Sequence, residues 1–142
     1  MTLRGEPQIA GDAEGLVLKL ARPISFWGGV DPTTGRISDP RHPNHDSEIG
    51  GRILVLPGMI GSSSSSYIML ELMAIRRAPA ALLLAEPDAI LGLGVVVARE
   101  MSYGSIPVVV LPREQQAKLE TGQLVRIERD GTVALLSQGV NS

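Results

Sequence analysis

Short apolar runs alternate with segments of helical character in the middle of this chain, and that alternation most restricts the fold. The run at residues 52–56 is apolar enough for a central strand, and the run at 81–84 indicates a second buried strand. Between them, residues 67–75 combine helix-forming residues with apolar side chains at helical spacing. Pro79 then prevents that helix from continuing. Strands that alternate with helices are typical of an α/β domain.

The flanking segments extend the same pattern. We expect an irregular lead over residues 1–15 and a long loop from Val30 to Gly51, which is rich in Pro, Gly, Asp and Asn. Loops of that length are often functional. Further strands are expected at 16–20, 106–111, 124–128 and 132–136, and further helices at 89–101 and 113–120.

Local signals support several of these boundaries. Asp88 stands where it can cap the helix at 89–101, and Gly92 and Gly94 within it indicate close packing against a neighbouring element. Asp130-Gly131 predicts a tight hairpin between the last two strands. The chain is therefore predicted to be one α/β domain of the β/β/α type over residues 1–142. Its core is expected at about 16–136, with irregular termini and a C-terminal β-hairpin.

Composition excludes several kinds of chemistry. The chain has no cysteine, so it can form no disulfide, offers no thiol nucleophile and cannot ligate a cluster through thiolates. The formal net charge is −2 and no basic patch is present, which argues against nucleic-acid binding. No apolar run reaches the roughly 18–20 residues that span a bilayer. The N-terminus lacks the apolar core of a signal peptide, so we expect a cytoplasmic protein.

The stretch from Leu54 to Leu72 is the candidate site. A buried strand leads through a glycine turn into five serines, residues 62–66, which open a helix. The unpaired N–H groups of the first helical turn and the helix dipole together favour an anion there. Gly61 would let the backbone approach a ligand closely, and Ser62 would present its hydroxyl at the helix mouth.

A purely structural role for the serines is the alternative. Serine is a favoured helix N-cap, and one of the five is expected to serve as one. A single cap does not explain five serines in a row, because serine lowers helix propensity in the first turn. Small polar side chains at successive positions suit a surface against which a substrate or another subunit fits.

Better-known motifs do not match. The serine run lacks the lysine of a P-loop, and Ser64 replaces the second glycine of a nucleophile elbow. His42 and His45 with Asp46 form an incomplete zinc set, and a serine–histidine triad would need one of these histidines to reach Ser62. We expect the two histidines to be structural or solvated.

Five motifs, taken in order, resemble the small subunits of the aconitase X family. They are Ser25–Asp31 with Thr34–Ile37, His42-Pro43 before Ile53–Pro57, Gly61–Ser64 leading into Tyr67–Leu72, Ala78–Ala81, and Ile90-Leu91 with Gly94. Together they cover about residues 24–112.

This resemblance implies a swivelling β/β/α domain similar to the mobile domain of aconitases. It implies a hydro-lyase in which a separate or fused large subunit carries an iron–sulfur cluster and most substrate contacts. Without that subunit the chain is expected to be inactive. The family's catalytic serine, in a Gly-Ser-Ser context at a helix start, maps onto Ser62 as general base. Gly61, Ser63 and Ser64 would then hold the substrate anion or orient Ser62.

The resemblance also suggests a substrate. The unbroken serine run looks more like bacterial members, some of which dehydrate cis-3-hydroxy-L-proline, than archaeal members similar to mevalonate 5-phosphate dehydratases. The small subunit of a mevalonate 5-phosphate dehydratase is the alternative within the family. Outside it, a stand-alone anion-binding or interaction module is an alternative. Another is a swivel domain of a phosphotransfer enzyme, in which His42 or His45 would carry phosphate.

Overall fold

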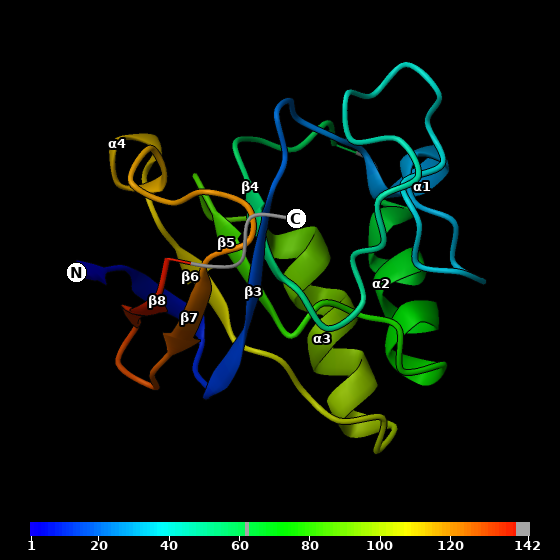
Figure 1. Ribbon diagram of the computed structural model, residues 1–142. Coiled ribbons are helices and arrows are strands. Elements are labelled where there is room, and N and C mark those ends of the chain that lie inside the picture. The colour runs from blue at the N-terminus through cyan, green and yellow to red at the C-terminus, as the bar shows by residue number, and fades with distance from the viewer. Residues whose placement is uncertain (62, 139–142) are drawn as a thin grey trace.

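Eight strands form one continuous sheet in the computed structural model, which describes residues 1–61 and 63–138 (Figure 1). The strands are β1 (Thr2–Arg4), β2 (Glu6–Ile9), β3 (Ala13–Lys19), β4 (Ile53–Leu56), β5 (Ala81–Leu84), β6 (Val108–Val110), β7 (Leu124–Ile127) and β8 (Thr132–Ser137). The helices are α1 (Phe26–Gly29), α2 (Ser65–Ala74), α3 (Ala89–Glu100) and α4 (Arg113–Gln116). Among these residues, no helix has the length and apolar character that crossing a membrane requires.

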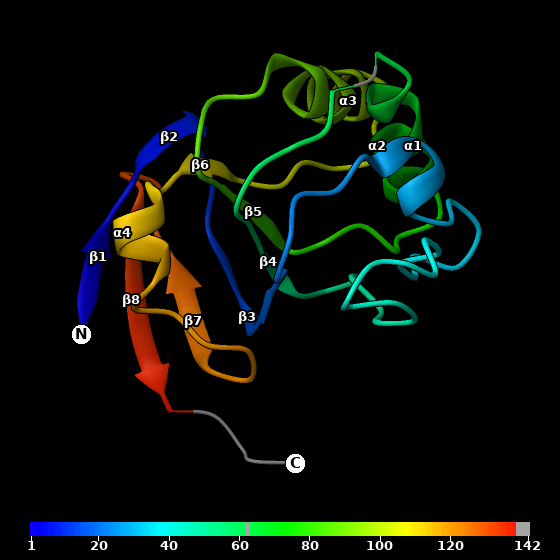
Figure 2. The same cartoon turned by 90° about the horizontal axis from the view of Figure 1, so that it is seen from above.

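The sheet curves round until its two ends meet. Its strand order is β1-β8-β7-β3-β4-β5-β6-β2, with parallel pairing from β3 to β6 and antiparallel pairing elsewhere. The first and last strands in this order, β1 and β2, are separated in the chain only by Gly5. The N-terminal segment therefore bridges the two ends of the sheet, which Figure 2 shows from above. At this junction the Gly5 N–H donates to the Gly131 carbonyl at 3.0 Å, and an added Cβ on Gly5 would collide with Val109.

The expectation of an irregular lead over residues 1–15 was wrong. This segment forms β1, β2 and the first residues of β3. Most of its side chains are exposed or half-buried, and Leu3 is its one buried residue. The two strands are held by main-chain pairing with β8 and β6, so they lack the run of apolar residues that reveals a buried strand.

Alternate side chains of the parallel strands enter two different cores. Ile53 and Val55 of β4 point into the curved sheet, while Leu54 and Leu56 point toward the helices, and β5 repeats the pattern. Because both faces of these strands are covered, their sequences are apolar throughout. The second face packs against the buried sides of α2 and α3, whose helical layer lies beside the sheet in Figure 1. The chain is thus the predicted β/β/α domain with a C-terminal hairpin formed by β7 and β8.

The helices confirm the local signals. Asp88 caps α3 by accepting hydrogen bonds from the Ile90 and Leu91 N–H groups at 2.9 and 3.0 Å. Gly94 is a point of close approach between α3 and α2. A Cβ added there would lie 2.6 Å from the Ser66 carbonyl oxygen and 2.9 Å from the Met69 Cβ.

Two predicted elements are shorter than expected. The helix expected at 113–120 ends at Gln116, and the chain continues in turns. The strand expected at 106–111 is limited to Val108–Val110, in part because Pro107 has no N–H to donate. The long segment from Val30 to Gly51 is a loop, as predicted.

Candidate active site

The serine segment lies at the edge of the sheet where the parallel strands end. β4 ends at Leu56, residues 57–61 cross this edge, and α2 begins at Ser65. Because β3, β4, β5 and β6 run in parallel, the loops that follow them gather at the same edge, which is uppermost in Figure 1. Among the described residues, the order of strand, turn, serines and helix is as predicted.

Two distant parts of the chain hold the start of this loop. From α4, the Gln116 side chain donates to the Leu56 carbonyl at 3.0 Å, and Arg113 Nε donates to the Pro57 carbonyl at 2.8 Å. From the segment before α1, the Ile24 carbonyl accepts from the Ile60 N–H at 3.1 Å. These bonds fix where the chain leaves β4. The contribution of α4 left no local signal in the sequence, because it comes from residues far along the chain.

The structure describes the predicted site residues on either side of Ser62. Gly61 and Ser63 are exposed, and a Cβ added to Gly61 would meet no atom within 4 Å. Ser62, the predicted catalytic residue, lies outside the described residues. The roles predicted for Gly61, Ser62, Ser63 and Ser64 therefore stay predictions.

The remaining serines start the helix in different ways. Ser64 occupies the N-cap position of α2, and its carbonyl accepts from the Tyr67 N–H at 3.1 Å. The Ser66 hydroxyl donates to the Ser63 carbonyl at 2.9 Å. A serine of the run thus takes the N-cap position, as expected, but the Ser64 side chain makes no capping hydrogen bond, so the cap is met in position only.

Ser65 is a feature that sequence analysis missed. It is 2% exposed, and its Oγ has no hydrogen-bond partner among the residues that the structure describes. The signal was its spacing, because Ser65 stands four residues before Met69 and seven before Leu72, on the stripe of α2 that faces the core.

The segment between β4 and α2, residues 57–64, is called the serine loop below. A small polar hollow lies beside its first residues. Its volume is about 110 Å³, and its walls come from the loops after β4 and β5: Leu56, Gly58, Met59, Leu84, Ala85, Glu86, Pro87 and Asp88. Its carboxylates come from Glu86 and Asp88, and the latter is already used as the cap of α3. This acidic lining does not suit an anion, so the hollow is distinct from the anion site predicted at the mouth of α2.

The two histidines have different surroundings. His42 is buried, with Nε2 3.0 Å from the Arg22 carbonyl, to which it donates, and Nδ1 accepting from the Asn44 N–H at 3.0 Å. Both ring nitrogens of His42 are thus engaged in holding the loop. His45 Nδ1 lies 3.6 Å from an Asp46 carboxylate oxygen, with both side chains partly or largely exposed.

The donor set of the chain does not fit an iron–sulfur cluster. There is no cysteine in the sequence. The part of the chain that the structure describes contains no group of three His, Cys, Asp or Glu side chains that could hold a metal ion. If such a cluster takes part, its ligands lie outside these 142 residues.

Comparisons with known proteins agree with this geometry. A family model described as the aconitase X swivel domain matches residues 2–135. A cis-3-hydroxy-L-proline dehydratase of Pseudomonas aeruginosa is 46% identical over 103 residues, which are 72% of this chain and 18% of that protein. A phosphomevalonate dehydratase small subunit of Thermococcus kodakarensis is 36% identical over 98% of this chain and 99% of its own length.

A solved structure supports the same relationship. A crystal structure of Thermococcus kodakaraensis aconitase X in its holo form has a chain that superposes with a TM-score of 0.85 at 34% identity. The match covers 96% of this chain and 99% of that one. The chain spans about a fifth of the Pseudomonas dehydratase and nearly all of the Thermococcus subunit. The sequence, the topology and these matches together show that the chain belongs to the aconitase X swivel-domain family.

Proposed function

We propose that this chain is the small subunit of an aconitase-X-type hydro-lyase that dehydrates cis-3-hydroxy-L-proline together with a large subunit in the cytoplasm. The observation that carries the proposal is the serine run between β4 and α2, within a domain that matches the family over residues 2–135. The relative named for this substrate is 46% identical over the matched segment. The iron–sulfur cluster is assigned to the large subunit, because the donor set of this chain does not fit one.

In this proposal Ser62 is the general base. Its oxygen takes a proton from a substrate carbon, the electron pair of that C–H bond forms the double bond, and hydroxide leaves the adjacent carbon. A serine hydroxyl is a weak base at neutral pH, so its alkoxide must be stabilised. A general base at this position requires that backbone N–H groups and the positive end of the α2 dipole favour the alkoxide over the hydroxyl.

The neighbouring residues bind the substrate. The N–H groups at the start of α2 provide donors for a substrate carboxylate, and the exposed Ser63 hydroxyl provides another. Gly61 has open space around its Cα, which allows a ligand to approach the backbone. Ser64 either contributes a further donor or orients Ser62.

The test is Ser62→Ala in the complex with the large subunit. General-base catalysis contributes roughly 10²–10⁴-fold, so kcat should fall by at least 10² while the circular dichroism spectrum and complex formation stay unchanged. Ser66→Ala is the matched control, because the Ser66 hydroxyl is bonded within the first turn of α2 and has no role in the proposal. Turnover by Ser62→Ala close to that of the unmodified complex would remove Ser62 from the mechanism.

Mevalonate 5-phosphate is the second candidate substrate. A Thermococcus relative named phosphomevalonate dehydratase small subunit is matched over 98% of this chain, which favours this alternative. Turnover of the two acids by the same reconstituted complex distinguishes them. A preference for the phosphorylated acid would overturn the assignment of cis-3-hydroxy-L-proline and leave the hydro-lyase reaction in place.

A further inference from the structure

Four large apolar side chains are exposed around the first turns of α2. Trp27 is 55% exposed, Ile60 58%, Tyr67 54% and Leu93 55%. We call these four residues the apolar band. They come from α1, the serine loop, α2 and α3, which lie together on one side of the molecule (Figure 2).

Two hollows flank the start of α2 beside residues of this band. On one flank, Trp27 and Ile68 line an open hollow of about 510 Å³ between α1 and α2. On the other flank, Tyr67 and Leu93 line a groove of about 210 Å³ between α2 and α3. Because Tyr67 and Ile68 are adjacent in α2, the two hollows lie on either side of the same helical turn.

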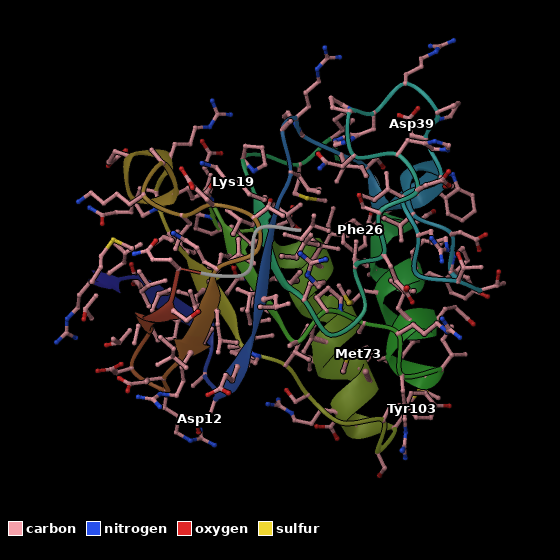
Figure 3. All side chains as sticks on the ribbon, viewed as in Figure 1. Asp12, Lys19, Phe26, Asp39, Met73 and Tyr103 are labelled. Atoms are coloured by element: carbon pink, nitrogen blue, oxygen red, sulfur yellow. The ribbon has the colours of Figure 1, made fainter. Side chains whose placement is uncertain are left out.

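Two residues of the band, Trp27 and Tyr67, have neighbours that define their surroundings. Trp27 follows Phe26, which is fully buried and anchors α1 beside α2 (Figure 3). The Glu71 carboxylate, one turn along α2, hydrogen-bonds the Tyr67 hydroxyl and raises the pKa of that group. Tyr67 presents an apolar ring with a polar tip, a combination enriched in protein interfaces.

The relatives indicate what covers such a face. In the Pseudomonas dehydratase the matched segment is 18% of the protein, so about four fifths of that polypeptide lies outside it. The Thermococcus relative is matched over 99% of its length and is named a small subunit. In both, the domain has a larger counterpart, fused in one and separate in the other.

The position of the band also restricts its occupant. Ile60 stands one residue before Gly61, so a protein seated on the band borders the serine loop. If Ser62 acts on a substrate bound mainly by the large subunit, that subunit must approach this edge of the sheet. We propose that the apolar band is the surface on which the large subunit docks. This inference rests on the proposed function.

The chain contains one tryptophan, which allows a direct test. The small subunit is labelled with 5-fluorotryptophan, which gives a single ¹⁹F resonance from position 27, and the unlabelled large subunit is titrated in. The resonance should shift or broaden at the stoichiometry of the complex. A resonance that is unchanged at saturation would overturn the proposal.

Substitutions give a second, independent readout. Tyr67→Gln with Leu93→Gln should raise the Kd for the large subunit at least tenfold, since truncated interface aromatics typically cost this much. Met101→Gln is the control, because Met101 is 50% exposed and stands at the C-cap of α3, whereas Leu93 lies in the first half of that helix. It should change Kd less than twofold. If the double variant fails to fold, Leu93→Gln alone and the ¹⁹F titration decide.

The outcomes separate this proposal from the function on which it rests. At saturating large subunit the double variant should recover the kcat of the unmodified complex, because the band does not take part in the reaction. Unchanged Kd in the double variant, with Ser62→Ala still inactive, would overturn the docking surface alone. Self-association of the chain that the double variant abolishes, with binding of the large subunit intact, would assign the band to a second copy and also overturn the proposal.

Discussion

Gly94→Ala should destabilise the domain, although alanine is the better helix former. Gly94 lies in the middle of α3, where replacing glycine by alanine gains about 1 kcal/mol of helix propensity. The added Cβ would lie 2.6 Å from the Ser66 carbonyl oxygen and 2.9 Å from the Met69 Cβ. Neither atom is the end of a flexible side chain, so α2 must move away from α3.

Overpacking a close contact costs about 1–3 kcal/mol, and a clash with backbone belongs at or beyond the upper end of that range. After subtracting the gain in propensity, we expect a net loss of about 2 kcal/mol in the free energy of unfolding. For a chain of this length, that corresponds to a fall in Tm of roughly 5–8 °C. Urea denaturation followed by circular dichroism measures the loss.

Gly92→Ala is the matched control on the same helix. Its added Cβ would lie 2.9 Å from the Gln8 Nε2, so the side chain that must adjust is one that donates to the Asp88 carbonyl at 2.9 Å, and no backbone atom is crowded. We therefore expect Gly92→Ala to lie within about 1 kcal/mol of the unmodified protein, since propensity offsets the adjustment of Gln8. Equal stability of Gly94→Ala and Gly92→Ala would refute the claim that α2 and α3 meet at Gly94.

Two further perturbations test other parts of the structure. Gln116→Leu removes the buried hydrogen bond to the Leu56 carbonyl, and it should lower the free energy of unfolding measured in urea by about 1 kcal/mol. The loss is no larger because the Ala85 N–H still donates to that carbonyl. No loss would show that this bond does not hold the end of β4. Hydrogen bonds from the Thr132 side chain and N–H hold the pKa of Asp130 below its ordinary 3.8. The ionised Asp130 carboxylate therefore stabilises the folded state fully above pH 3.8, and this stabilisation is lost as pH falls through the lowered pKa. The unfolding free energy of Asp130→Asn should therefore approach that of the unmodified protein as pH falls below 3.8 and through the lowered pKa, and a constant difference at all pH values would contradict this assignment.

The sequence predicted those elements that bury apolar side chains or carry a specific local signal. β4, β5, α2 and the hairpin of β7 and β8 are where the apolar runs, helical spacing and Asp130-Gly131 place them. Asp88 caps α3 as expected. These features depend on residues close together in the chain, so local physical rules suffice to predict them.

The sequence could not predict how the sheet closes. β1 and β2 are held by main-chain pairing to strands more than a hundred residues away, and apart from Leu3 their side chains are not buried. The support of the serine loop by Arg113 and Gln116 is likewise a consequence of the tertiary fold. Both depend on which distant segments meet, and neither leaves a periodic pattern in the sequence.

At the candidate site, the sequence predicted the arrangement of the loop and not the environment of each serine. The order of strand, turn, serines and helix is as expected, and Ser64 takes the N-cap position. The burial of Ser65 follows from the rotation of α2 against the sheet, which the serine run itself does not reveal. The role of Ser62 rests on the resemblance and on the chemistry expected at a helix start.

The division of labour between two polypeptides is the central claim, and one assay tests it most directly. Water loss from cis-3-hydroxy-L-proline is measured with the purified chain, with the large subunit, and with equimolar amounts of both. We expect turnover in the mixture alone, rising with added small subunit until the two are equimolar. Turnover at the full rate by either polypeptide without the other would contradict the account.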